Sequence, residues 1–286
     1  MKAIPANIVT AQLAVLPFYT EGPVLDAAGN LFFTTLAGGS IIKMDTTGQM
    51  ITWAKGERPN GQVILPDGDH LVCDSKSGSI HRFDPDGRFV KHELMGSCAG
   101  HKVHAACDLV FQAGAGIYFT DAVRERGNVF FIGIDGHQEI VAQDIDFPNG
   151  LVLSHDQRSL FVAESYRNRI LQIPLATPGV AAGPAEVWAT LPVHPSGKMI
   201  DNLPDGLELD EEGYLLVAHY GMQAVQVLAP DGTWLYAIDT GLPLTSNVML
   251  LQGEGPQKTI IVTGGYAEPG PGAVMRINIQ WDQNEK

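Results

Sequence analysis

Residues 205–220 read DGLELDEEGYLLVAHY, and this pattern indicates how the whole chain folds. A short apolar run is followed by the polar turn DEEG and then by a second run of aliphatic and aromatic residues. Runs of this kind, bounded by turns that contain Gly, are typical of antiparallel strands joined by tight hairpins. Similar runs recur along the chain, as in NLFFTTL, HLVCDS, GIYFTDA, SLFVAES and TIIVTGG, whereas long segments with a helical period are missing. The sequence therefore predicts an all-β protein.

The same two-strand pattern occurs six times and aligns without gaps. The aligned segments begin 39 to 56 residues apart, close to the roughly 40–50 residues of a four-stranded propeller blade. We therefore predict a six-bladed β-propeller that forms a single domain over residues 1–286. The N-terminal run NIVTAQLAVL is expected to add a closing strand to the last blade, which removes an open edge. The longest interval, around residues 174–202, is expected to pass over one face. The six segments begin at Glu21, Asn60, Cys107, Asn149, Asp205 and Asn247.

The composition limits the partners and the location of the protein. The net charge is −14, with 32 acidic against 18 basic residues, and no basic stripe is visible, so a nucleic-acid partner is not expected. No apolar run of about 18 residues predicts a membrane span, and the N-terminus lacks the pattern of a signal peptide. Three cysteines without a C-x-x-C motif fit a reducing compartment. We expect a cytoplasmic protein, a monomer or small homo-oligomer, that acts on a small molecule.

The first residue of each aligned segment opens the innermost strand of its blade. A radial arrangement brings these six residues together around one end of the central tunnel, and none of them is apolar. Two carboxylates and three amides would form a ring of oxygen donors, which suits hard cations and Ca²⁺ first. Asp-Gly and Asn-Gly are also common hairpin turns, which is the alternative interpretation. However, a further turn follows one strand length after Asp205, which favours a strand start.

Four motifs, taken together, resemble the SMP-30/gluconolactonase/LRE-like family. They are EGPVLDAAGNLFFT, FPNGLVLSHDQRSLFVAES, LPDGLELDEEGYLLVAHY and SNVMLLQGEGPQKTIIVTGG, and they cover most of residues 15–280 in order. The resemblance implies a six-bladed propeller with one catalytic divalent metal ion, usually Ca²⁺. It matches Glu21, Asn149 and Asp205 to the metal ligands of the family, and Asp205 also to its candidate general base. The implied reaction is lactone hydrolysis, in which the metal acts as a Lewis acid on the carbonyl group.

The stretch HAACDLVF, residues 104–111, departs from the family pattern. Cys107 occupies the position where the family commonly has an Asn at the metal or the substrate. The Arg or Asn that binds sugar hydroxyls in regucalcin-like members corresponds to Ala105 or Ala106. A lactone that is more apolar than a polyhydroxylated sugar lactone, or a related cyclic ester, is therefore the expected substrate.

Three interpretations of Cys107 remain open. As a thiolate ligand it would favour Zn²⁺ or Mn²⁺ over Ca²⁺, and as a nucleophile it would need His104 as its base. As a small, nearly apolar residue it would only shape the pocket. His104 itself is expected at the rim, in contact with the substrate. The other residues expected to contact the substrate are Asn60, Asn247, His219 and Tyr220.

Two alternatives to a lactonase remain at this stage. The same fold could carry a phosphotriesterase or a strictosidine-synthase-like enzyme, although the metal-ligand pattern disfavours the metal-free synthase. It could also be a non-catalytic, metal-binding propeller.

Overall fold

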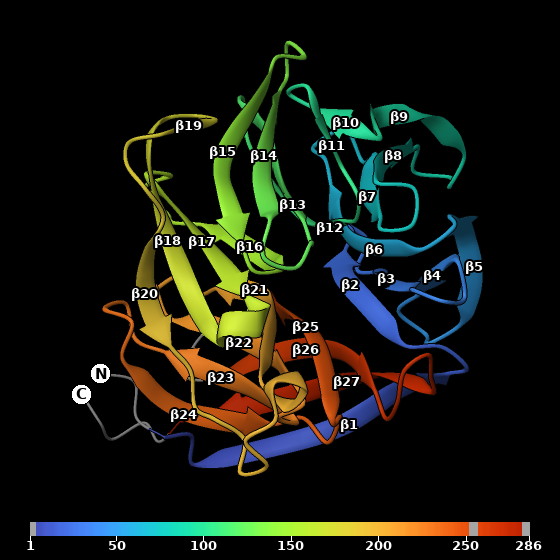
Figure 1. The fold of residues 1–286 in the computed structure, drawn as a ribbon. Helices are drawn as coiled ribbons and strands as arrows, with labels where there is room; N and C mark the ends of the chain where they lie inside the picture. The colour runs from blue at the N-terminus through green and yellow to red at the C-terminus, as the bar shows by residue number, and fades with distance from the viewer. Residues whose placement is uncertain (1–3, 252–256, 282–286) are drawn as a thin grey trace.

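The computed structural model describes residues 4–251 and 257–281. Over these residues the strands form six four-stranded blades arranged around a central axis (Figure 1), and a single pair, Tyr220 with Leu244, joins the last two blades. This arrangement confirms the predicted six-bladed β-propeller. Each blade begins with the strand nearest the axis and ends with the outermost strand. The blades are β2 (Thr20–Leu25), β3 (Leu31–Thr35), β4 (Ser40–Met44), β5 (Met50–Lys55); β6 (Pro59–Ile64), β7 (His70–Asp74), β8 (Ser79–Phe83), β9 (Phe89–Met95); β12 (Ala106–Gln112), β13 (Gly116–Asp121), β14 (Gly127–Gly133), β15 (Gln138–Ile145); β16 (Pro148–Leu153), β17 (Ser159–Glu164), β18 (Arg169–Thr177), β20 (Glu186–Thr190); β21 (Leu203–Leu209), β22 (Leu215–Tyr220), β23 (Ala224–Leu228), β24 (Trp234–Asp239); and β25 (Leu244–Leu251), β26 (Gln257–Gly265), β27 (Gly272–Gln280), β1 (Asn7–Leu16).

The N-terminal strand completes the last blade, as the sequence predicts. β1 pairs antiparallel with β27, from Asn7 opposite Gln280 to Leu16 opposite Gly272. In Figure 1 it lies as a long strand along the outside of the sheet formed by the C-terminal strands. The two ends of the chain therefore share one sheet, and this pairing closes the ring of blades without a covalent link.

The hairpins within the blades follow from the turn chemistry of the repeat. Gly29, Gly68 and Gly213 occupy the same aligned position and have φ of +83°, +89° and +87°. This left-handed region is unfavourable for residues with a Cβ atom. The fourth aligned glycine, Gly255, lies outside the described residues.

The hydrophobic core lies between the blades. Each cluster of buried apolar residues combines the facing sides of two neighbouring sheets; for example, one cluster joins Leu71 and Ile80 of the second blade to Phe119 and Phe130 of the third. Because every blade is packed on both faces, the inner strands hold a fixed distance from the axis. The residues at their starts are therefore held in place by six separate packing layers.

The remaining elements are short. They are β10 (Ser97–Cys98), β11 (His101–Lys102), β19 (Val180–Ala181) and the 3-10 turns η1 (Ser165–Arg167) and η2 (Met199–Asp201). None of the helical turns in the described residues is long and apolar enough to cross a membrane. The long interval of residues 174–202 contains β19, β20 and η2, and Ile200 of η2 reaches the cavity described next.

Candidate active site

The inner strands turn their first residues toward the axis through a repeated irregularity. In each of the six, the pairing with the second strand of the blade shifts near the start of the inner strand, for example between Pro148 and Leu151 of β16. A bulge of this kind redirects the side chains beside it. The glycines that follow the ring residues let neighbouring strands approach closely. A Cβ atom at Gly150 would lie only 2.3 Å from the carbonyl oxygen of Asp205.

A cavity of about 350 Å³ opens at this end of the tunnel. Five of the six predicted ring residues line it, and each of them is less than 9% exposed. The structure thus brings together all four side chains that the sequence assigns to a metal. The five are Glu21, Asn60, Cys107, Asn149 and Asp205.

Asn247, the sixth ring residue, lies below the others. It lines a second cavity of about 690 Å³ toward the other end of the tunnel, together with Asp108 and Glu208. Its side-chain amide is close enough to the carboxyl groups of Glu21 and Asp108 to lower the pKa of each. The larger cavity lacks the other ring side chains, so the smaller cavity is the better candidate for an active site.

Glu21 and Asp205 form a pair of buried carboxyl groups. Burial, followed by the charge of Asp108, raises the pKa of Glu21, and burial followed by the charge of Glu21 raises the pKa of Asp205 well above its usual value. Asp108, directly beneath, has a pKa raised to about 7 by burial. Within the described part of the chain, neither Glu21 nor Asp205 forms an ion pair. Two buried acids side by side without a cation are unfavourable, and a divalent cation between them would remove that cost.

The donor set decides what kind of cation fits. Over residues 4–251 and 257–281, no three His, Cys, Asp or Glu side chains form a group that could hold a metal ion. A metal site here must therefore use amide oxygens as well as the two carboxylates. That mixture of ligands is typical of Ca²⁺, so the residues present fit a hard divalent cation.

Cys107 lies in a chain of hydrogen bonds within the ring. Its Sγ accepts a hydrogen bond from Asn60 Nδ2 (3.2 Å) and donates one to Asn149 Oδ1 (3.0 Å). Burial, with the nearby charges of Asp205 and Glu21, raises the pKa of this thiol well above its usual value. These two hydrogen bonds hold the side chain of Asn149 in place, a geometry that fits the pocket-shaping interpretation.

His104 lies beside the site but does not line the cavity. Its imidazole Nδ1 is 3.5 Å from Asp121 Oδ2, and its side chain is 43% exposed. The neighbouring Ala105 lines the cavity instead. Because the imidazole is directed to Asp121, the geometry does not favour a Cys107 nucleophile activated by His104.

Tyr220 and His219, adjacent on β22, have different surroundings because successive strand residues point to opposite faces. Tyr220 lines the cavity, and its hydroxyl is 3.4 Å from Glu268 Oε2. His219 is fully buried, with Nδ1 3.3 Å from Gln226 Nε2. Burial lowers the pKa of His219 to about 3, so it is neutral, and it does not line the cavity.

Acidic residues at the ends of second strands anchor the loops that lead into the ring. Asp74 Oδ2 accepts hydrogen bonds from the backbone N–H groups of Glu57 and Arg58, at 2.7 and 3.0 Å. Asp121 Oδ1 binds the N–H groups of His104 and Ala105 in the same way, at 2.9 and 2.7 Å. These hydrogen bonds fix the backbone two to three residues before a ring residue.

Sequence reasoning missed most of the cavity wall, although the repeat contains a signal for it. The residues two positions before the ring residues occupy equivalent places in the six blades, at or next to the start of each inner strand. In five of the six blades that position lines the cavity, and in the sixth it is Thr245. The five residues are Tyr19, Arg58, Ala105, Phe147 and Leu203.

The chain is similar in sequence and in structure to known proteins of one family. A family model described as the SMP-30/Gluconolactonase/LRE-like region matches residues 19–265. Lactonase drp35 of Staphylococcus haemolyticus is 31% identical over 224 residues, which cover 74% of this chain and 66% of that protein, just under two thirds of its length. A gluconolactonase structure from Xanthomonas campestris covers 97% of this chain and 91% of its own, with a TM-score of 0.81 and 24% identity. Regucalcin from Agrobacterium tumefaciens, described as a calcium-binding protein, covers 99% of this chain and 97% of its own, with a TM-score of 0.77 and 18% identity.

Proposed function

The chain belongs to the SMP-30/Gluconolactonase/LRE-like family, and on this basis we propose that it hydrolyses a lactone or related cyclic ester in the tunnel-mouth cavity. One observation carries the proposal. The buried carboxyl groups of Glu21 and Asp205 share this cavity with the amide of Asn149, and they lack a cationic partner among the described residues. The names of the related lactonase and gluconolactonase support the reaction type.

Glu21, Asn149 and Asp205 are the residues that would hold a divalent cation. Their carboxylate and amide oxygens favour Ca²⁺, and the calcium-binding relative supports the same choice. When bound, the ion would polarise the ester carbonyl group as a Lewis acid. The hydrogen bonds of Cys107 to Asn60 and Asn149 support a positioning role for it, and on this proposal Zn²⁺ and Mn²⁺ are the less favoured ions.

Asp205 is the proposed general base. It would accept a proton from the attacking water as the new acyl C–O bond forms, and the ring oxygen would receive a proton as the ester C–O bond breaks. A carboxylate close to a cation is a weak base, so orienting the water is a large part of its contribution. Asn60, on the same wall, can donate a hydrogen bond to the substrate.

Other residues keep the ring in position. Ser165 Oγ donates to the carbonyl oxygen of Pro204 at 2.7 Å and lies 3.5 Å from Asn149 Nδ2. It therefore links the Asn149 side chain to the backbone directly before Asp205. Such links hold reacting groups in place without reorganisation during the reaction.

The walls of the cavity support a substrate with an apolar body. Aromatic and aliphatic side chains make up about half of the lining residues, and the small Ala105 lines the cavity with Cys107. Flat apolar groups stack favourably on such walls. The apolar side chains include Tyr19, Phe147, Tyr166, Ile200, Leu203 and Tyr220.

The test compares an apolar lactone, dihydrocoumarin, with glucono-δ-lactone in a pH-stat assay. We expect hydrolysis of dihydrocoumarin that chelation abolishes and Ca²⁺ restores. Asp205→Asn should lower kcat by about 10³-fold or more.

Glu208→Gln, which changes a buried carboxyl of the other cavity, is the matched control and should retain activity. Full turnover by Asp205→Asn, or turnover that is indifferent to chelation, would contradict the proposal. Turnover of a phosphotriester in place of either lactone would favour the phosphotriesterase alternative.

A further inference from the structure

Arg58 is the only basic residue that lines the cavity in the described part of the chain. It lies two residues before Asn60, in the loop that leads from the first blade into the second. We propose that its guanidinium group forms a carboxylate-binding subsite at the rim of the cavity. The substrate is then a lactone whose apolar body carries a carboxylate group. The lactone part of this inference rests on the proposed function, whereas the carboxylate-binding subsite at Arg58 does not.

The backbone of Arg58 is anchored on both sides. Its N–H donates to Asp74 Oδ2 at 3.0 Å, and its carbonyl oxygen accepts hydrogen bonds from Ser75 N at 3.0 Å and Ser75 Oγ at 3.2 Å. Asp74 is only 1% exposed and joins the loop of Glu57 and Arg58 to the turn of Ser77. A side chain on such a base loses less freedom when it binds a ligand than one on a mobile loop.

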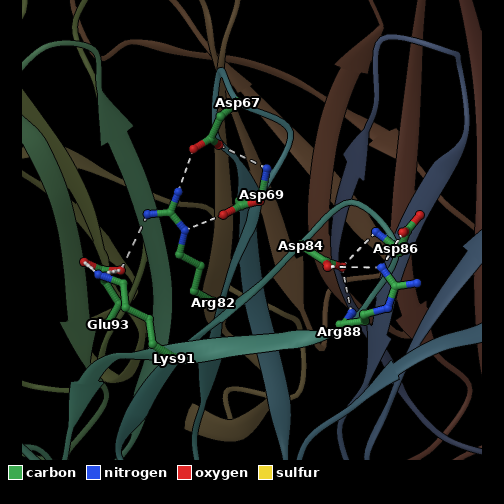
Figure 2. Close-up of polar contacts among 8 residues, drawn as sticks. All are labelled: Asp67, Asp69, Arg82, Asp84, Asp86, Arg88, Lys91 and Glu93. Atoms are coloured by element: carbon green, nitrogen blue, oxygen red, sulfur yellow. Dashed lines mark hydrogen bonds and ion pairs between the residues drawn. The ribbon is translucent and has the colours of Figure 1, made fainter.

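The guanidinium group of Arg58 is only loosely engaged. Its one ion pair with another described residue joins Nη2 to Glu268 Oε1 at 3.4 Å, and the two side chains are 47% and 39% exposed. Other arginines are held much more closely. Arg82 contacts Asp67 and Asp69 at 2.6 and 2.5 Å (Figure 2). The Arg58 donors are therefore available to a ligand, because an exposed pair at this distance contributes little stability.

Glu268 indicates which anion fits. Its carboxylate already lies against the guanidinium group, and its other oxygen lies near the hydroxyl of Tyr220. A ligand carboxylate would take the place of Glu268 against the guanidinium group, so the Glu268 charge competes with the ligand. One guanidinium group matches one carboxylate in the bidentate geometry, whereas a doubly charged phosphate beside Glu268 would lack a second cation. Arg58 and the aromatic walls belong to one cavity, so the same ligand can contact both.

The first experiment measures binding without turnover. Metal-free protein is titrated by calorimetry with 3-phenylpropanoate, which combines a flat apolar body with one carboxylate. We expect binding that Arg58→Gln weakens at least about tenfold, that Arg58→Lys weakens less, and that Glu268→Gln strengthens. Arg88→Gln removes the same charge from an exposed turn of the second blade (Figure 2) and should leave binding unchanged. Equal binding by wild type and Arg58→Gln would overturn the inference.

The second experiment measures specificity. The kcat/KM of dihydrocoumarin is compared with that of a dihydrocoumarin carrying a carboxylate on its aromatic ring. The carboxylated lactone should be preferred by wild type, and Arg58→Gln should reduce that preference about tenfold, mainly through KM. If neither lactone is hydrolysed by the Ca²⁺-loaded protein, the proposed function fails, while the binding experiment still decides the subsite. An equal loss on both lactones would mean that Arg58 is only structural, which refutes the subsite.

Discussion

Replacing Asp74 by Asn tests whether a buried acid anchors the loops that carry the site. Asp74 Oδ2 accepts hydrogen bonds from the N–H groups of Glu57 and Arg58, and Oδ1 accepts those of Lys76 and Ser77. An Asn side chain has one acceptor oxygen, so one pair of N–H groups would face its NH₂ group instead. Two N–H groups left without an acceptor cost about 1–3 kcal/mol each when buried. Because the loop is partly exposed, we expect a total loss of about 2–4 kcal/mol in the free energy of unfolding.

The pH dependence of this loss has a definite sign. Burial opposes ionisation of Asp74, but the hydrogen bonds from Arg58, Ser77 and Glu57 outweigh it and hold its pKa below the usual value. A depressed pKa in the folded state stabilises the protein above the unfolded pKa of about 3.9, and that contribution disappears as the pH falls through the lower folded value. The difference between wild type and Asp74→Asn should therefore be constant near neutral pH and shrink below about pH 4.

Urea unfolding at several pH values measures this difference directly. Asp84→Asn is the control, because Asp84 accepts the N–H groups of Asp86 and Arg88 in an exposed hairpin turn (Figure 2). It should cost no more than about 1 kcal/mol. A loss at Asp74 no larger than this control, or one that is unchanged between neutral pH and pH 3, would refute the reasoning.

Three further predictions concern the ring and its closure. Cys107→Ala removes the S–H donor to Asn149, so calorimetric titration should show about tenfold weaker Ca²⁺ binding, and Cys107→Ser should restore most of it. Gly150→Ala places a Cβ atom 2.3 Å from the carbonyl oxygen of Asp205, and thermal unfolding should show a loss of about 1–3 kcal/mol, together with weaker metal binding. Deletion of residues 1–16 removes β1 from β27, and differential scanning calorimetry should show a lower Tm, with light scattering reporting association through the exposed edge of β27.

The sequence predicted the fold and five of the six ring positions because both depend on a local rule. Each blade repeats the same order of inner strand, Gly turn and second strand. Residues at the same position of the six aligned segments therefore lie at about the same height along the propeller axis. Polar residues at the start of apolar strands then stand out, since only a functional cavity or a turn tolerates them there. Glu21 and Asp205 illustrate this, as each is buried at the opening of an otherwise apolar strand.

Asn247 shows where the local rule fails. In β25 the bulge lies between Thr245 and Asn247, before the ring position. In β16 it lies between Pro148 and Leu151 and includes the ring residue Asn149. This earlier shift accompanies the lower position of Asn247, beside Asp108. A bulge depends on pairing between strands, so a single column of residues does not reveal its position. The contact of Arg58 with Glu268 is also hidden, because 210 residues separate them.

The geometry of the repeat also explains how the site could change its substrate while it keeps its chemistry. Residues at the ring positions supply oxygen donors, and the residues two positions earlier supply the wall, including Arg58, Ala105 and Phe147. The two sets are adjacent along the chain, in the inner strands and in the loops that lead into them, but they contact different parts of a bound molecule. A substitution in the wall leaves the packing between blades and the carboxyl pair of Glu21 and Asp205 in place. Substitution of Arg58 should therefore alter which lactone is bound before it alters how the lactone is opened.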